Sequence, residues 1–224
     1  MGNKKYEVFL EISGNTAMWT RPDTGDCPVS YPAPTYSAVK GIFESILWGP
    51  AIEVVPTKVE ICAPITYHNY QTNYGGPLRE IGVMKSGGGY QLLATVLIDV
   101  CYRMYAEIVP IRKSSKNDIP NGARKWDKAT TSPGHAYQDI FYRRLKRGQC
   151  FSIPCLGWKE FGADYFGPFR DDTVVQHDIK IDITSMLRLV FPEGYKSNRN
   201  YIYDQNIEIK SGILEYPRKE YGNA

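Results

Sequence analysis

Two segments with helical periodicity, separated by runs of alternating apolar and polar residues, constrain the fold of this chain most. The first, residues 35–48, begins at Thr35, whose hydroxyl is suited to cap a helix N-terminus. Its apolar residues recur on one helical face, namely Tyr36, Val39, Phe43 and Ile46. This pattern predicts an amphipathic helix that ends at about Trp48 and covers one face of a sheet.

The second segment, residues 132–148, carries the signals of both helix ends. Ser132 is the predicted N-cap, Pro133 suits the first helical position, and Gly148 suits the C-terminal stop. The apolar face of this predicted helix consists of Tyr137, Ile140, Phe141 and Leu145.

The remaining periodic runs alternate with the period of two that is typical of β-strands. They occupy residues 6–13, 51–68, 92–111, 177–191 and 206–217. The run at 92–111 is compatible with two strands or with one bent strand. The order of strands and helices predicts an α+β fold, a ferredoxin-like (RRM-like) domain followed by further antiparallel strands.

The same order predicts how the chain is divided. Residues 1–170 form the ferredoxin-like domain, with a β-hairpin insertion at about 68–92 where turn residues cluster. Residues 171–224 form a small C-terminal antiparallel β-sheet domain. A four-stranded sheet with both helices on one face leaves its other face free for nucleic acid.

The charge of the chain is unevenly distributed. The net charge is +3, yet residues 101–150 contain 11 Lys and Arg against 4 Asp and Glu, which gives this segment +7 and the remainder −4. Such a concentration favours a surface that faces a polyanion. A solvated loop followed by a basic helix end explains the same excess.

Several classes of protein and site are not supported. The first residues run directly into a strand, so we expect no signal peptide, and the longest apolar run, "LLATVLIDV", is too short to cross a membrane. Five scattered cysteines without a Cys-x-x-Cys motif predict neither a disulfide framework nor a zinc site. We therefore expect a cytoplasmic protein with reduced thiols and with no metal or cofactor.

Cationic residues in three places are the predicted contacts for phosphates. One group lies at the end of the second helix and consists of Arg143, Arg144, Lys146 and Arg147. Cations there relieve the helix dipole by ~0.3–1 kcal/mol each, which explains one or two of them, so the others indicate phosphate contact. The further candidates are Lys125 and Lys128, in the irregular basic segment 112–131, and Lys85, beside a run of glycines.

His135 and Tyr137, near the start of the same helix, are the candidate catalytic residues. A neutral imidazole can accept a proton from a ribose hydroxyl, and a phenol can orient a phosphate. The alternative for His135 is an ordinary surface histidine, which its isolation in the sequence favours. The alternative for Tyr137 is a ring that packs in the core.

Three stretches of the sequence together resemble one family. They are "VSYPAPTYSAVKGIFESILWGPAIEVVPTKVEICAPI", "ATVLIDVCYRMYAEI" and "DIFYRRLKRGQCFSIPCLGWKEFGADY". Their order and spacing are similar to those of the CRISPR-associated RAMP-superfamily proteins of subtype I-C, the type I-C precursor-crRNA endoribonucleases. The resemblance covers most of residues 5–170.

The resemblance implies a function as well as a fold. It implies that the protein binds the CRISPR repeat hairpin and cleaves it without a metal, by attack of a 2′-hydroxyl on the adjacent phosphate. The protein then stays on the 5′ handle. The implied partners are the crRNA and the other subunits of the type I-C Cascade complex, with double-stranded DNA as a further candidate ligand.

The catalytic positions of the family are not matched in this chain. Members carry a tyrosine just before W-x-P at the end of the first helix, where this chain has Leu47. They carry a Lys-His pair where this chain has Ala136 and Tyr137, with His135 one place earlier. Two interpretations follow: a re-registered site built on His135 and Tyr137, or a non-catalytic subunit that only caps the 5′ handle.

Overall fold

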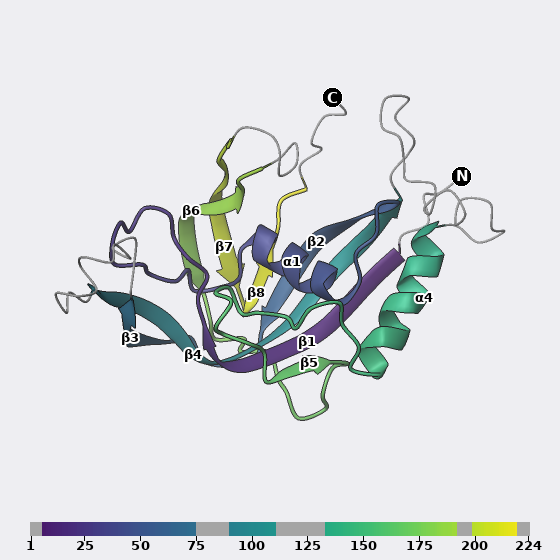
Figure 1. Cartoon of the computed structure of the whole chain (residues 1–224), viewed down its shortest axis with the longest axis horizontal. Helices are drawn as coiled ribbons and strands as arrows, with labels where there is room; N and C mark the ends of the chain where they lie inside the picture. Colours follow the sequence, from purple (N-terminus) through teal and green to yellow (C-terminus); the bar gives the residue numbers. More distant parts are fainter. Residues whose placement is uncertain (1–5, 75–89, 111–132, 192–198, 219–224) are drawn as a thin grey trace, which may run out of the picture.

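The computed structural model describes residues 6–74, 90–110, 133–191 and 199–218. Within them the chain forms one antiparallel sheet and two helices, so the predicted α+β class is confirmed (Figure 1). The helices are α1 (Tyr36–Ile46) and α4 (Pro133–Lys146). The strands are β1 (Tyr6–Ala17), β2 (Ile52–Ile61), β3 (Thr66–Tyr74), β4 (Tyr90–Pro110), β5 (Tyr165–Gly167), β6 (Ile181–Leu189), β7 (Ile202–Lys210) and β8 (Ile213–Glu215).

The strands follow the order β5-β1-β4-β2-β8-β7-β6, and β3 pairs with the N-terminal half of β4. The C-terminal half of β4 lies between β1 and β2. Asp99, with a φ of 52°, marks the bend between the two halves, so β4 is one bent strand where the sequence allowed one strand or two. In the described part of the chain no helix is long and apolar enough to span a bilayer.

The start of α1 is capped as its sequence predicts. The hydroxyl oxygen of Thr35 accepts a hydrogen bond from the backbone N–H of Ala38 at 3.3 Å. The helix ends at Ile46, and the backbone of Leu47 after it is extended, close to the predicted end at about Trp48.

The end of α4 also follows its sequence signal. Gly148 adopts a left-handed φ of 62°, which a residue without Cβ reaches at no steric cost. The N–H groups of Gly148 and Gln149 donate to the carbonyls of Leu145 and Arg144, at 3.2 and 2.9 Å. This Schellman motif satisfies carbonyls that the helix leaves without partners. The predicted N-cap, Ser132, lies outside the described residues.

The core lies between the sheet and the two helices. Alternate residues of β1 face the helices, and Val8, Leu10 and Ile12 have no exposed surface. Phe43 of α1 and Phe141 of α4 pack against each other with ring centroids 5.6 Å apart. The two helices therefore cover the same face of the sheet and touch one another.

The strands β6, β7 and β8 continue the same sheet through the pairing of β8 with β2. The predicted turn at residues 210–212 is confirmed, since Ser211 and Gly212 adopt left-handed φ values of 50° and 73° between β7 and β8. The phenol of Tyr216 donates to the carbonyl of Pro34 at 2.7 Å, which fastens this part of the chain to the start of α1. The division at residue 170 stays a prediction, and residues 75–89 of the predicted hairpin insertion lie outside the described residues.

Glu11, fully buried on the face of β1 opposite to the helices, holds the loop after β5 against the sheet. Its carboxylate accepts hydrogen bonds from Nε of Arg170 at 2.5 Å and from the hydroxyl of Thr173 at 2.7 Å, and it pairs with Arg103 at 3.4 Å. Burial raises the pKa of Glu11, but the hydrogen bonds from Thr173 and Arg170 outweigh it and hold the pKa below its ordinary value.

The substitution Glu11→Gln is expected to lower the free energy of unfolding at pH 7 by about 1.5–3 kcal/mol, the usual worth of hydrogen bonds to a charged group. Because the folded-state pKa is depressed, the carboxylate stabilises the fold above its unfolded-state pKa of about 4.3 and loses this effect as the pH falls through the folded-state pKa. Urea unfolding at pH 7 and at several acidic pH values should show the two proteins converging at the acidic end. The control is the exposed Glu7→Gln, and a difference that is independent of pH would contradict the role of ionised Glu11.

Candidate nucleic-acid interface

The end of α4 is tied to the end of α1 by Arg144. Its guanidinium donates to the carbonyl of Ile46, the last residue of α1, at 2.7 Å, and the side chain is half-buried. The final carbonyls of a helix lack intrahelical partners and attract cations, so this contact caps α1. Arg144 is thus engaged within the protein, and its predicted contact with RNA stays a prediction.

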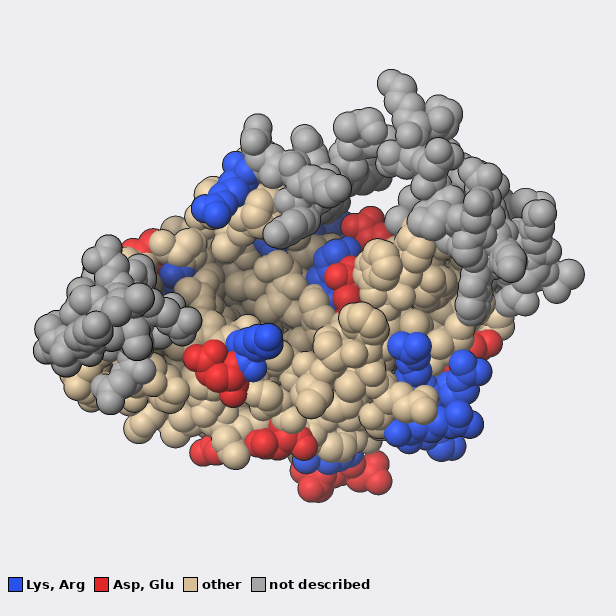
Figure 2. Space-filling model, in the orientation of Figure 1, with Lys and Arg blue, Asp and Glu red and all other residues tan. Residues whose placement is uncertain are grey.

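The other three cations of this turn point to solvent. Arg143, Lys146 and Arg147 are exposed, and within the described ranges no carboxylate forms an ion pair with any of them. Figure 2 shows Lys and Arg side chains gathered over the C-terminal end of α4. We call these three residues the basic turn. Because no carboxylate of the described residues neutralises its charges, the basic turn suits an anionic ligand.

His135 lies in the first turn of α4 with 43% of its side chain exposed. Its Nε2 is 3.4 Å from a carboxylate oxygen of Asp139, one turn further along the helix, so the two form an ion pair when the imidazole is protonated. The imidazole also lies beside the ring of Tyr6, with ring centroids 6.3 Å apart. His135 is therefore accessible and held in place from two sides.

Tyr137 faces the interior instead. Two residues along a helix correspond to about 200° of rotation, so His135 and Tyr137 project from opposite sides of α4. The phenol of Tyr137 lies against Gly49, just beyond α1, and a Cβ at that position would overlap it. Burial raises the pKa of Tyr137, which keeps its hydroxyl protonated at neutral pH. The structure does not bring the two candidate residues together on one surface.

At the end of α1, where the resemblance implies a tyrosine, this chain has the apolar residue Leu47. Leu47 is 9% exposed and belongs to the core. However, the contact between Tyr137 and Gly49 brings a phenol from α4 within two residues of Leu47. The sequence did not indicate this contact, because it joins residues far apart in the chain.

Three predicted RNA contacts, Lys85, Lys125 and Lys128, lie outside the described residues.

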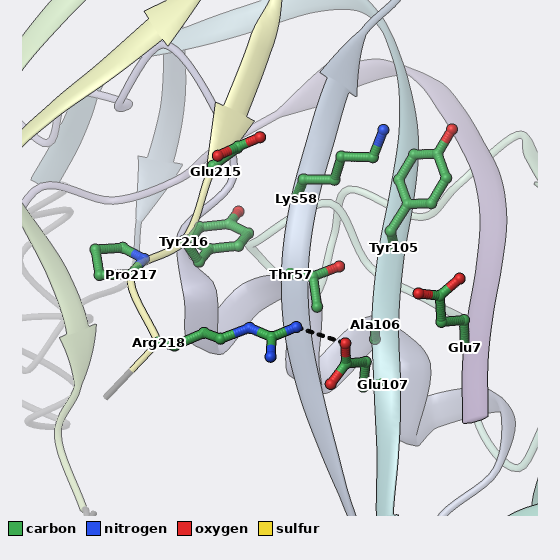
Figure 3. A pocket seen from close by; sticks show the side chains of 10 residues that line it. All are labelled: Glu7, Thr57, Lys58, Tyr105, Ala106, Glu107, Glu215, Tyr216, Pro217 and Arg218. Carbon is green, nitrogen blue, oxygen red and sulfur yellow. Dashed lines mark hydrogen bonds and ion pairs between the residues drawn. The ribbon is translucent and has the colours of Figure 1, made fainter. Parts of the chain in front are cut away.

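The face of the sheet opposite to the helices has a different charge from the basic turn. A cavity of about 750 Å³ opens there, lined by residues of β1, β2 and β4 and by the segment around β8 (Figure 3). Its charged lining residues are Glu7, Glu107, Glu215, Lys58 and Arg218. Arg218 pairs with Glu107, and Lys58 pairs with the adjacent Glu60, both at 2.6 Å. Among the described residues this excess of carboxylates, with both cations neutralised, makes the cavity less suited to phosphates than the basic turn.

Comparison with known proteins identifies the family. Residues 8–215 match Cas_Cas5d, a family described as CRISPR-associated protein (Cas_Cas5). A protein of Mannheimia succiniciproducens named CRISPR pre-crRNA endoribonuclease Cas5d is 30% identical over 231 residues, covering 94% of both chains.

Two solved structures share the fold at low sequence identity. One, described as a crystal structure of a CRISPR-associated protein, superposes with a TM-score of 0.69 at 17% identity and covers 97% of this chain and 95% of that chain. A chain of a CRISPR RNA-guided surveillance complex superposes with a TM-score of 0.51 at 12% identity, covering 94% and 91%. The sequence match over residues 8–215 shows that the chain belongs to the Cas5d family of CRISPR-associated proteins.

Proposed function

We propose that this protein binds the hairpin of a CRISPR repeat, cleaves the precursor RNA and then stays on the 5′ handle as a subunit of an RNA-guided surveillance complex. The observation that carries the proposal is the basic turn, three exposed cations at the end of α4, in a chain that aligns almost from end to end with a pre-crRNA endoribonuclease. Phosphates of an RNA backbone are the ligands that such a cluster attracts most strongly.

The proposed chemistry is attack of a ribose 2′-hydroxyl on the adjacent phosphate without a metal. The P–O5′ bond breaks, a 2′,3′-cyclic phosphate remains on the upstream product, and the 5′-oxygen of the downstream product leaves and takes up a proton from water. His135 accepts the proton of the attacking hydroxyl, because it is the accessible imidazole on the helix that carries the basic turn. The cations of the basic turn lie two to three helical turns from His135, about 12–18 Å along the axis at 1.5 Å per residue, so they hold neighbouring phosphates of the same RNA strand rather than the one that is attacked. The role that we propose for Tyr137 is structural. Its contact with Gly49 holds the start of α4 against the residues that follow α1. Its predicted catalytic role stays a prediction.

Within the α+β fold, we infer that residues 1–170 form a ferredoxin-like domain. The strand path β5-β1-β4-β2, with α1 and α4 as the two crossing helices, supports this assignment. On the same basis we propose that the hairpin at about 68–92 is an insertion and that residues 171–224, with β6, β7 and β8, are the C-terminal β-sheet domain.

A non-catalytic subunit that only caps the 5′ handle is the second candidate function. The observation that favours it is Leu47, a buried apolar residue at the position where the resemblance implies a tyrosine.

Incubation of the purified protein with a repeat-hairpin RNA in EDTA distinguishes the two candidates. A single cut beside the hairpin, with a cyclic phosphate on the upstream product, is the expected result. Binding without a cut, both in EDTA and with added Mg²⁺ or Mn²⁺, identifies the non-catalytic subunit. A cut only with added metal contradicts the metal-independent mechanism, and absence of binding contradicts both candidates.

Reversing the charges of the basic turn, with Arg143→Glu, Lys146→Glu and Arg147→Glu combined, is expected to weaken hairpin binding about 10- to 100-fold at physiological salt. The plot of log affinity against log salt should also become flatter by about 0.9 for each lost phosphate contact. Fluorescence anisotropy over a range of salt concentrations measures both effects.

The matched control makes the same change in net charge elsewhere, with Lys180→Glu, Arg199→Glu and Lys210→Glu, all exposed in the C-terminal part of the chain. If the two triple variants weaken hairpin binding equally and flatten its salt dependence equally, binding depends only on the net charge. The basic turn is then not the site that contacts the RNA.

A further inference from the structure

Two aromatic side chains beside the basic turn are exposed to an unusual degree. Phe151 is 84% exposed, more than any other large hydrophobic residue in the described part of the chain, and Trp48 is 62% exposed. By contrast, Trp19 is only 1% exposed. An aromatic ring gains most of its stabilising free energy from burial, so rings left in water indicate a surface that receives a ligand.

Both rings are placed by the end of α1. The backbone N–H groups of Phe151 and Ser152 donate to the carbonyl of Ser45, at 2.8 and 3.0 Å. Trp48 lies three residues after Ser45, immediately beyond α1. The segment that follows α4 is thereby fixed against the last turn of α1, and Phe151 projects from backbone held by hydrogen bonds.

The basic turn belongs to the same region. Arg144 joins it to the carbonyl of Ile46, and only Gly148, Gln149 and Cys150 separate Arg147 from Phe151. A shallow cavity of about 280 Å³ between α1 and the segment at 152–157 adjoins this surface. The segments that carry the exposed rings and the exposed cations therefore meet at the end of α1.

We propose that Trp48 and Phe151 form a stacking platform for unpaired RNA bases whose phosphates contact the basic turn. This inference rests on the proposed RNA-binding function and names the form of RNA that the surface takes. Bases inside a duplex are already stacked on one another, whereas unpaired bases stack on aromatic side chains. The neighbouring cations favour this polyanion over an apolar protein partner. An apolar partner would strip water from these charges without pairing them, which costs free energy.

The test compares single-stranded oligonucleotides with and without bases. The probes are an oligoadenylate of about 12 nucleotides, within the usual range of binding-site sizes, and an abasic RNA of equal length and charge. Affinities are measured by anisotropy for the wild type, Phe151→Ala, Trp48→Ala and Phe151→Tyr. The control variant is Tyr201→Ala, at an exposed aromatic residue outside this surface.

Each alanine variant is expected to bind oligoadenylate roughly 5- to 150-fold more weakly, the loss expected for one stacked base, and to bind the abasic RNA like the wild type. Phe151→Tyr, which keeps the ring, and Tyr201→Ala should bind both probes like the wild type. An equal loss on both probes, or no loss on either, overturns the stacking platform. Weaker binding to another subunit of the complex with unchanged RNA binding overturns it in favour of a protein contact.

A repeat-hairpin binding assay on the same proteins separates this inference from the proposed function. Wild-type protein that binds the hairpin but shows no preference for oligoadenylate over abasic RNA retains the proposed function and loses the stacking platform. Wild-type protein that binds no RNA loses both.

Discussion

Replacing His135 by alanine is expected to slow cleavage of a CRISPR repeat hairpin by about 10²–10⁴-fold, the usual contribution of a general acid or base. Binding of the hairpin should be unchanged, because the exposed imidazole is separate from the basic turn. Single-turnover cleavage in EDTA, with anisotropy on the same RNA, measures the two quantities.

The matched control is His177→Ala. His177 is also exposed, and its Nδ1 lies 3.2 Å from the carbonyl of Ser211, remote in the chain from α4. The His177→Ala variant should cleave the hairpin at the wild-type rate. Equal rates for His135→Ala and the wild type would refute the assignment of the base. A parallel loss of cutting and binding would instead indicate that His135 supports the structure.

Tyr137→Phe separates the two roles considered for that residue. The substitution keeps the ring that packs beside Gly49 and removes only the hydroxyl. A slower cut with unchanged thermal stability would assign the hydroxyl to the reaction. An unchanged rate would assign Tyr137 to packing, as its burial suggests.

Replacing Arg188 by leucine is expected to lower the free energy of unfolding by about 3–5 kcal/mol, which for a chain of this size corresponds to a fall in Tm of about 6–20 °C. Arg188 pairs with Asp204 at 2.8 Å, both side chains are 2% exposed, and the guanidinium lies 3.8 Å above the ring centre of Tyr36. The substitution leaves the carboxylate of Asp204 in an apolar environment without this cation. Thermal and urea unfolding measure the loss.

The double variant Arg188→Met with Asp204→Leu provides the control. Replacing both members of a buried ion pair by apolar residues of similar volume is often neutral or stabilising, so most of the lost stability should return. A single variant within about 1 kcal/mol of the wild type would show that the ion pair between β6 and β7 is dispensable.

Much of the secondary structure could be predicted because its signals are local. The cap at Thr35 and the glycine turn at Gly148 depend on hydrogen bonds that reach only three to five residues along the chain. The apolar periodicity of both helices likewise identified the residues that face the core. Whether residues 92–111 form one strand or two was not decided by periodicity, because a bend at Asp99 leaves the alternation on either side intact.

The candidate site could be predicted only in part, because its residues are divided between two helices. The basic charge at the end of α4 is visible in the sequence, and so is His135. That Arg144 caps α1 is not visible, since its partner Ile46 is 98 positions away. Nor did the sequence indicate that Tyr137 turns inward or that Phe151 stays in water, because both depend on what α1 places beside them.

By itself, therefore, the sequence determined the helices, the N-cap of α1, the glycine end of α4, most strands, the basic segment and the resemblance to a family. Each of these follows from residues that are close in the chain or from a sequence pattern that does not depend on tertiary contacts. Only the tertiary structure decided which cations remain exposed and which residues share a surface. The packing of α4 against α1 engages Arg144, buries Tyr137 and leaves Arg143, Lys146 and Arg147 in solvent, because the contacts available to each side chain depend on its direction around the helix.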